Sequence, residues 1–150
     1  MRTSSSLLVL LLAAALFSVG CLPGFAPTPT PIPSQALVER TPPASCTAIL
    51  LPGLFTSAET FRRQGIAPLA EEKAPGLDVI GTDAHLAYYR KKMILTRLQE
   101  DLVGPQIEDD RKVWLLGTSL GGVGALLYAR GQNGDERLPD ADRLAGVVLL

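Results

Sequence analysis

The sequence predicts an α/β fold in which helices flank a mostly parallel sheet. Three short apolar runs, residues 48–51 (AILL), 113–116 (VWLL) and 144–150 (LAGVVLL), have the composition of strands that are buried on both faces. The second run leads directly into helix-forming residues 120–130, and helical patterns also separate the first run from the second. Strands that alternate with helices favour parallel pairing.

The first 20 residues have the pattern of an export signal. One basic residue and three serines precede an apolar core at residues 7–17, which is too short to span a bilayer as a stable helix. Cys21 follows Val19 and Gly20, a pattern that resembles the lipobox of bacterial lipoproteins. We therefore predict a lipid anchor at Cys21 and a membrane-anchored protein of the cell envelope. The alternative is a secreted protein in which Cys21 is free or forms a disulfide with Cys46.

Residues 21–44 predict a linker, because proline recurs throughout them. Proline keeps the backbone extended and removes hydrogen-bond donors, so such a stretch is a semi-rigid tether. The globular part is then residues 45–150. Its first strand is expected at residues 48–51, which leaves no sequence for earlier strands.

Turn and cap residues divide the next part of the chain into further elements. A strand is expected at residues 77–81, and apolar residues at helical spacing predict an amphipathic helix over residues 90–103, ended by Gly104-Pro105. The two short helices expected before that strand are residues 58–64, capped by Ser57, and residues 69–73, opened by Pro68.

The motif G-x-S-x-G stands between the second apolar run and its helix, as Gly117-Thr118-Ser119-Leu120-Gly121. A strand that turns into a helix through this motif is a nucleophile elbow, in which a strained backbone exposes the serine hydroxyl. The alternative is a coincidental strand-to-helix turn. A phosphate-binding loop does not fit, because no Gly-Lys-Ser/Thr follows and the glycine spacing differs from G-x-G-x-x-G.

On this elbow, the strand before it and residues 50–54 (LLPGL), residues 46–150 resemble the α/β-hydrolases, and more loosely their lipase-like and esterase-like bacterial members. The resemblance implies the N-terminal portion of that fold, ending after the strand that follows the elbow helix. It implies that Ser119 attacks an ester or other acyl bond. The backbone N–H groups of Leu120 and Leu54 would form the oxyanion hole, with Phe55 in place of Leu54 if the loop is aligned one residue later.

The family places an acid and then a histidine after the elbow, so both are expected beyond Leu150, in a longer hydrolase. His85 is the only histidine and precedes Ser119, on a strand expected to be separated from the elbow strand by residues 48–51. This order disfavours His85 as the base. We expect His85 either to line the pocket, as Phe55 would, or to make structural hydrogen bonds, and Asp83 matches a family aspartate that holds its loop together.

Composition excludes several other classes of function. The 14 Lys+Arg against 15 Asp+Glu give a net charge of −1, so no positive electrostatic field attracts nucleic acid to the protein. One histidine without ligand-like cysteine spacing gives no reason to expect a metal, and no cofactor is expected. The expected partners are a small-molecule or lipid-like acyl substrate and, through Cys21, a membrane. A second hypothesis is a non-catalytic envelope lipoprotein, or an inactive fragment, that uses the same scaffold for binding.

Overall fold

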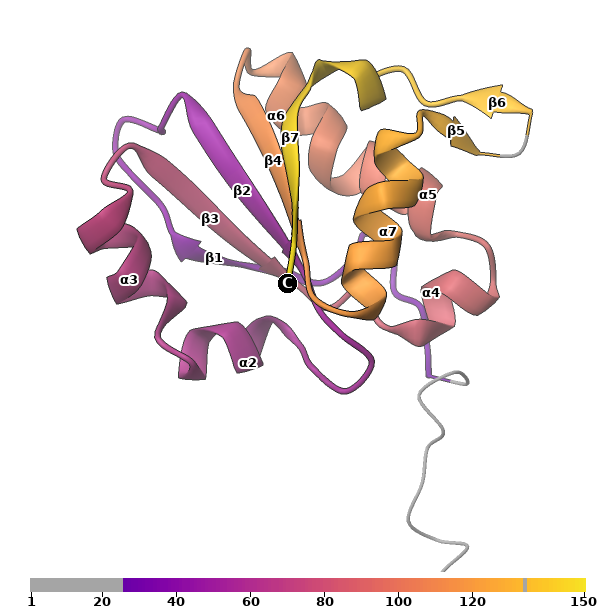
Figure 1. Cartoon of the computed structure of the whole chain (residues 1–150), viewed down its shortest axis with the longest axis horizontal. Coiled ribbons are helices and arrows are strands. Elements are labelled where there is room, and N and C mark those ends of the chain that lie inside the picture. Colours follow the sequence, from indigo (N-terminus) through magenta and orange to yellow (C-terminus); the bar gives the residue numbers. More distant parts are fainter. Residues whose placement is uncertain (1–25, 134) are drawn as a thin grey trace, which may run out of the picture.

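The centre of the fold is a five-stranded sheet, which a computed structural model shows within the described residues 26–133 and 135–150 (Figure 1). Its strands are β1 (Ser34–Val38), β2 (Cys46–Leu51), β3 (Leu77–Thr82), β4 (Lys112–Gly117) and β7 (Leu144–Leu149). Their spatial order is β1-β3-β2-β4-β7. Only β1 runs antiparallel to its neighbour, and the other pairs are parallel. The predicted α/β fold with a mostly parallel sheet is therefore confirmed.

Helices cover the sheet on both faces, with two on one side and a longer series on the other (Figure 1). The two are α2 (Ala58–Arg63) and α3 (Ile66–Lys73). The series comprises α4 (Leu86–Arg90), α5 (Ile94–Arg97), a π-helical segment (Leu98–Val103), α6 (Gly104–Glu108) and α7 (Leu120–Ala129). A hairpin of β5 (Gln132–Asn133) and β6 (Glu136–Arg137) and a 3-10 turn (Ala141–Arg143) follow α7.

The side chains of β4 alternate between the two faces. Val113 and Leu115 are fully buried in the larger core cluster, beneath the series of helices that includes α7. Leu116 packs from the opposite face against the smaller cluster beneath α2 and α3, and Trp114 is exposed. The second face is therefore less completely covered around β4 and β7.

The proline-rich segment at residues 21–44 contains a strand that was not predicted. β1 pairs with β3 along the sheet edge. Ile32 is buried in the larger core, and its N–H donates to the Asp101 carboxylate at 2.9 Å. Pro33 directly precedes β1, and proline is tolerated at the start of an edge strand. The segment is thus part of the packed domain from about Ile32 onward, and the linker prediction was wrong there.

The helix predicted over residues 90–103 begins later and continues past Gly104-Pro105. It begins at Ile94, and its π-helical turn lets the Gly104 N–H donate to the Gln99 carbonyl. In a regular α-helix the Pro105 ring would clash with the carbonyl four residues earlier. The wider π turn accommodates the proline, so this Gly-Pro pair does not end the helix.

The signal peptide at residues 1–20 and the lipidation site Cys21 lie outside the described residues. Cys46, the first residue of β2, forms no disulfide with any residue of the described part. Within that part, no helix combines the length and the apolar character needed to cross a membrane.

Candidate active site

Ser119 joins β4 to α7 in a strained backbone conformation. Its φ of 50° and ψ of −112° lie in a region that residues other than glycine rarely adopt. β4 ends two residues earlier, α7 begins at the next residue, and the Ser119 side chain is exposed. This is the strand–turn–helix geometry expected of a nucleophile elbow.

Both glycines of the motif are required by close backbone packing. A Cβ at Gly117 would overlap the backbone of Gly121, and a Cβ at Gly121 would overlap the Leu51 carbonyl. The same Cβ at Gly121 would lie 2.8 Å from the carbonyl oxygen of Pro52. The start of α7 therefore rests directly on the end of β2.

This packing brings the loop after β2 against the serine. The Thr118 N–H donates to the Leu51 carbonyl at 3.1 Å. A Cβ built on Gly53 would lie 3.5 Å from the Ser119 Cβ, which is van der Waals contact. Leu54 follows at once and is exposed, and Phe55 is 81% exposed.

The structure thus brings together Ser119 and the loop of the predicted oxyanion-hole residue Leu54. Leu120 is the first residue of α7, where a backbone N–H has no acceptor within its own helix. The N-terminus of a helix also favours negative charge. Backbone N–H groups that point at a developing oxyanion stabilise a tetrahedral intermediate.

The His85 side chain contacts residues of α4. Its Nδ1 accepts the Ala87 N–H at 3.3 Å, which caps α4, and its ring centroid lies 4.9 Å from that of Tyr88. β2 separates β3, the strand before His85, from β4, as predicted. In the described part of the chain, no hydrogen bond joins the Ser119 side chain to an imidazole or a carboxylate. The contacts of His85 therefore correspond to the structural hydrogen-bonding role, the second of the two roles expected for it.

Asp83 holds neighbouring elements together. Its Oδ1 accepts the Ala58 N–H at 2.8 Å at the start of α2. Its own N–H donates to the Pro33 carbonyl at 2.8 Å. The carboxylate therefore fixes the end of β3 against α2, while the backbone fixes it against the segment before β1.

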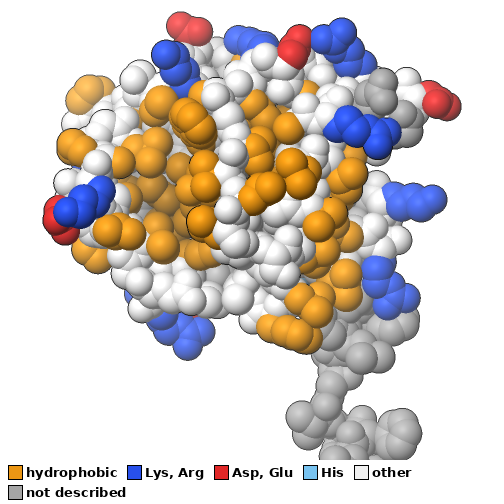
Figure 2. Space-filling view, in the orientation of Figure 1, with side chains coloured by type: hydrophobic (Ala, Val, Ile, Leu, Met, Phe, Trp, Pro, Cys, Tyr) orange, Lys and Arg blue, Asp and Glu red, His pale blue; other side chains and the backbone are white. Residues whose placement is uncertain are grey.

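An apolar groove, here called the sheet groove, lies between α3 and β4 with a volume of about 310 Å³. Hydrophobic side chains gather on this face of the molecule (Figure 2). Except for Lys73 and Thr118 its lining is apolar, and Thr118 brings one end of it next to Ser119. Other lining residues are Leu50, Phe61, Leu69, Leu116 and Leu150. The groove was not predicted, because it forms only where separate elements meet.

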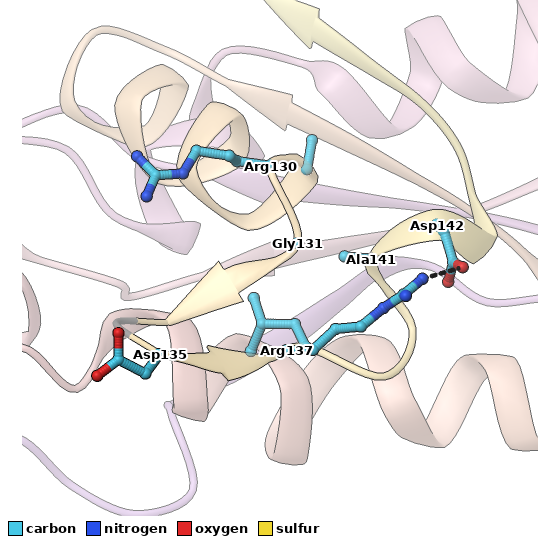
Figure 3. Close-up of a pocket in the computed structure, with 8 residues that line it drawn as sticks. Arg130, Gly131, Asp135, Arg137, Ala141 and Asp142 are labelled. Atoms are coloured by element: carbon cyan, nitrogen blue, oxygen red, sulfur yellow. Dashed lines mark hydrogen bonds and ion pairs between the residues drawn. The ribbon is translucent and has the colours of Figure 1, made fainter.

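A second pocket of about 260 Å³ lies at the far end of α7 (Figure 3). Arg130, Asp135, Arg137 and Asp142 line it, and Arg137 pairs with Asp142 at 2.8 Å. Because α7 has 10 residues, this pocket lies about 15 Å from Ser119 along the helix axis. It is therefore no part of the serine site.

Within residues 26–133 and 135–150, no group of three His, Cys, Asp or Glu side chains is placed to hold a metal ion. No protein-family model matches the chain, and no curated protein matches it. What is established is the mixed, mostly parallel sheet flanked by helices. The resemblance to α/β-hydrolases rests on the residues of the elbow, the strand before it and residues 50–54.

Proposed function

We propose that Ser119 is the nucleophile of a serine hydrolase that cleaves an ester or other acyl bond. The observation that carries this proposal is the Ser119 backbone at φ 50° between a parallel strand and a helix N-terminus. Such strain costs of the order of 1–3 kcal/mol and clusters at functional sites. Glycine would meet the same turn without strain, so a serine at this position points to its hydroxyl.

In the proposed reaction the Ser119 Oγ attacks the acyl carbon while a base takes its proton. The carbonyl oxygen becomes an oxyanion, which accepts hydrogen bonds from the N–H groups of Leu120 and Leu54. The leaving alcohol or amine receives the proton, and water then releases the acyl group by the reverse sequence. The base and its acid would come from residues after Leu150, as the family resemblance implies.

We also propose that the protein is held at a membrane of the cell envelope through lipid on Cys21. The support is the sequence alone, in which an apolar core and Val19-Gly20 precede the cysteine. Two or more acyl chains would anchor it firmly, since one chain gives only marginal binding. Mass spectrometry of the mature N-terminus tests this, and an unmodified Cys21 would exclude the anchor.

One observation favours a second candidate function, a non-catalytic binding protein. The single histidine caps α4, and no described imidazole or carboxylate reaches Ser119. A serine without a base is a weak nucleophile. On this hypothesis the turn at Ser119 is a structural part of the scaffold and has no catalytic role.

Labelling with a fluorophosphonate probe separates the two functions. The protein to use is the complete gene product, which includes any residues that follow Leu150. We expect one label per chain, retained in a Ser57→Ala control and absent from Ser119→Ala. If the folded wild-type protein is not labelled, or if the label persists in Ser119→Ala, the hydrolase proposal fails and the binding function is preferred.

A further inference from the structure

The loop between β2 and α2 is anchored at both ends. At its start, the Leu51 carbonyl accepts the Thr118 N–H at 3.1 Å. At its end, the Ala58 N–H donates to the Asp83 carboxylate at 2.8 Å. Residues 53–56 lie between the two anchors, so the contacts within this loop determine the direction in which its peptide groups point.

Within the loop, Thr56 binds one carbonyl through two donors. Its N–H donates to the Gly53 carbonyl at 3.4 Å, and its hydroxyl donates to the same oxygen at 3.3 Å. In a planar trans peptide the C=O and the N–H point in opposite directions. The Leu54 N–H belongs to the same peptide group as the Gly53 carbonyl. Thr56 therefore also fixes the direction of the Leu54 N–H.

The Leu54 N–H is free to bind an oxyanion. Among residues 26–133 and 135–150, no group accepts a hydrogen bond from it. Its peptide group starts at Gly53, where a Cβ would lie 3.5 Å from the Ser119 Cβ. Glycine has no side chain that resists rotation of this peptide. A rotated peptide would place a carbonyl oxygen where the N–H stands, and that oxygen would repel an oxyanion.

We propose that Thr56 is a positioning residue for the reaction at Ser119. Its hydroxyl keeps the Gly53–Leu54 peptide in the orientation that presents the Leu54 N–H to the oxyanion. Both of its hydrogen bonds are longer than usual, so the loss of one lets the peptide rotate more easily. This inference rests on the proposed function, and Thr56 acts through the peptide instead of on the substrate.

The kinetics of labelling by the fluorophosphonate probe test this role, on the complete gene product. Thr56→Val keeps the shape of the side chain and removes its hydroxyl. We expect the maximum rate constant of labelling to decrease about fivefold or more, because negative charge develops on the phosphoryl oxygen only as Ser119 attacks. The probe concentration that gives half of this rate should change less than about twofold. Thr56→Ser keeps the hydroxyl and should restore the rate constant.

Thr96→Val is the matched control. Thr96 is half-buried, as Thr56 is, and its hydroxyl also takes part in a hydrogen bond, which it accepts from Asn133 Nδ2 at 3.0 Å. It lies on α5, so this variant should leave both labelling constants unchanged. Circular dichroism checks the folding of every variant. If Thr56→Val unfolds, Thr56→Ala replaces it, because the smaller side chain cannot clash.

The other outcomes overturn the inference and separate it from the hydrolase proposal. If the folded wild-type protein is not labelled, the proposed function fails and this inference fails with it. If the wild type and Thr56→Val are labelled at the same rate, Ser119 remains the nucleophile and only the role of Thr56 is refuted. A loss that Thr56→Ser does not restore assigns the effect to packing. A change in the half-rate concentration alone places Thr56 in probe binding, and an equal loss in Thr96→Val indicates general destabilisation.

Discussion

At Ser119 the backbone and the proposed chemistry favour different residues. A φ of 50° suits glycine, whereas the proposed reaction needs a hydroxyl. We therefore predict that Ser119→Gly is more stable than Ser119→Ala by about 1 kcal/mol, because glycine relieves strain that alanine keeps. Urea unfolding of both variants measures the difference. Equal stabilities would mean that the elbow is not strained.

Single residues of the site were predictable to different degrees. The Ser119 conformation and the need for Gly117 and Gly121 follow from one local turn, so the sequence was sufficient. The proximity of Gly53 to Ser119 depends on the order of β2 and β4, and only the resemblance suggested it. The choice among roles for His85 stayed open, since the orientation of its ring depends on packing around α4.

At the scale of elements, Gly121 allows the start of α7 to pack closely on the end of β2. A Cβ there would overlap the Leu51 carbonyl, which the central strand holds in place. We predict that Gly121→Ala destabilises the fold by about 3 kcal/mol or more, because neither backbone can yield.

Gly76→Ala is the matched control for this prediction. A Cβ at Gly76 would meet nothing within 4 Å. Its effect should stay within about 1 kcal/mol, since alanine there only restricts the unfolded chain. Thermal unfolding followed by circular dichroism compares the two variants. Similar losses in both would contradict the proposed packing of α7 on β2.

The elements that were predicted well are those with a strong local pattern. The apolar runs became β2, β4 and β7, and the Ser57 cap starts α2 as expected. β1 was missed because an edge strand of five residues among prolines has no clear apolar alternation. The helical series ran past Gly104-Pro105 because a π turn absorbed the proline, a feature without a sequence signal in a single chain.

At the scale of the molecule, the features that the sequence alone did not predict depend on how separate strands and helices are arranged. The class of the sheet followed from strands alternating with helices. The sheet groove required the faces of β2, β4 and α3 to be known together. Likewise, the antiparallel pairing of β1 with β3 could not be predicted from the sequence alone.

Buried tyrosines make the stability of the whole domain sensitive to alkali. Burial raises the pKa values of Tyr89 and Tyr128 above the ordinary 10.0, and the carboxylate of Asp140 adds to the shift of Tyr128. For Tyr88, burial and then Asp101 and Asp83 raise the pKa. In the unfolded chain all three hydroxyls ionise near pH 10, while the native protein keeps them protonated.

Above pH 10 the unfolded state therefore binds fewer protons than the native state, so stability falls as pH rises. Well below pH 10 the contribution is fully present. We predict a midpoint temperature of unfolding that is constant from pH 8 to 9.5 and then decreases. The free energy of unfolding should decrease by up to about 1.4 kcal/mol per pH unit for each tyrosine. Calorimetry across this range measures it, and a flat profile up to pH 11 would show that the hydroxyls ionise freely in the native protein.

Two phenylalanine variants separate burial from hydrogen bonding. The Tyr89 hydroxyl is buried and has no hydrogen-bond partner among the described residues, whereas the Tyr128 hydroxyl donates to Gln99 Oε1 at 2.6 Å. Each variant should reduce, by the contribution of one proton, the slope with which the free energy of unfolding decreases above pH 10. At pH 7, Tyr128→Phe should lose about 1 kcal/mol with its hydrogen bond. Tyr89→Phe should be neutral or more stable, because it removes a buried polar group that no described residue satisfies. A larger loss in Tyr89→Phe than in Tyr128→Phe would place an acceptor at the Tyr89 hydroxyl.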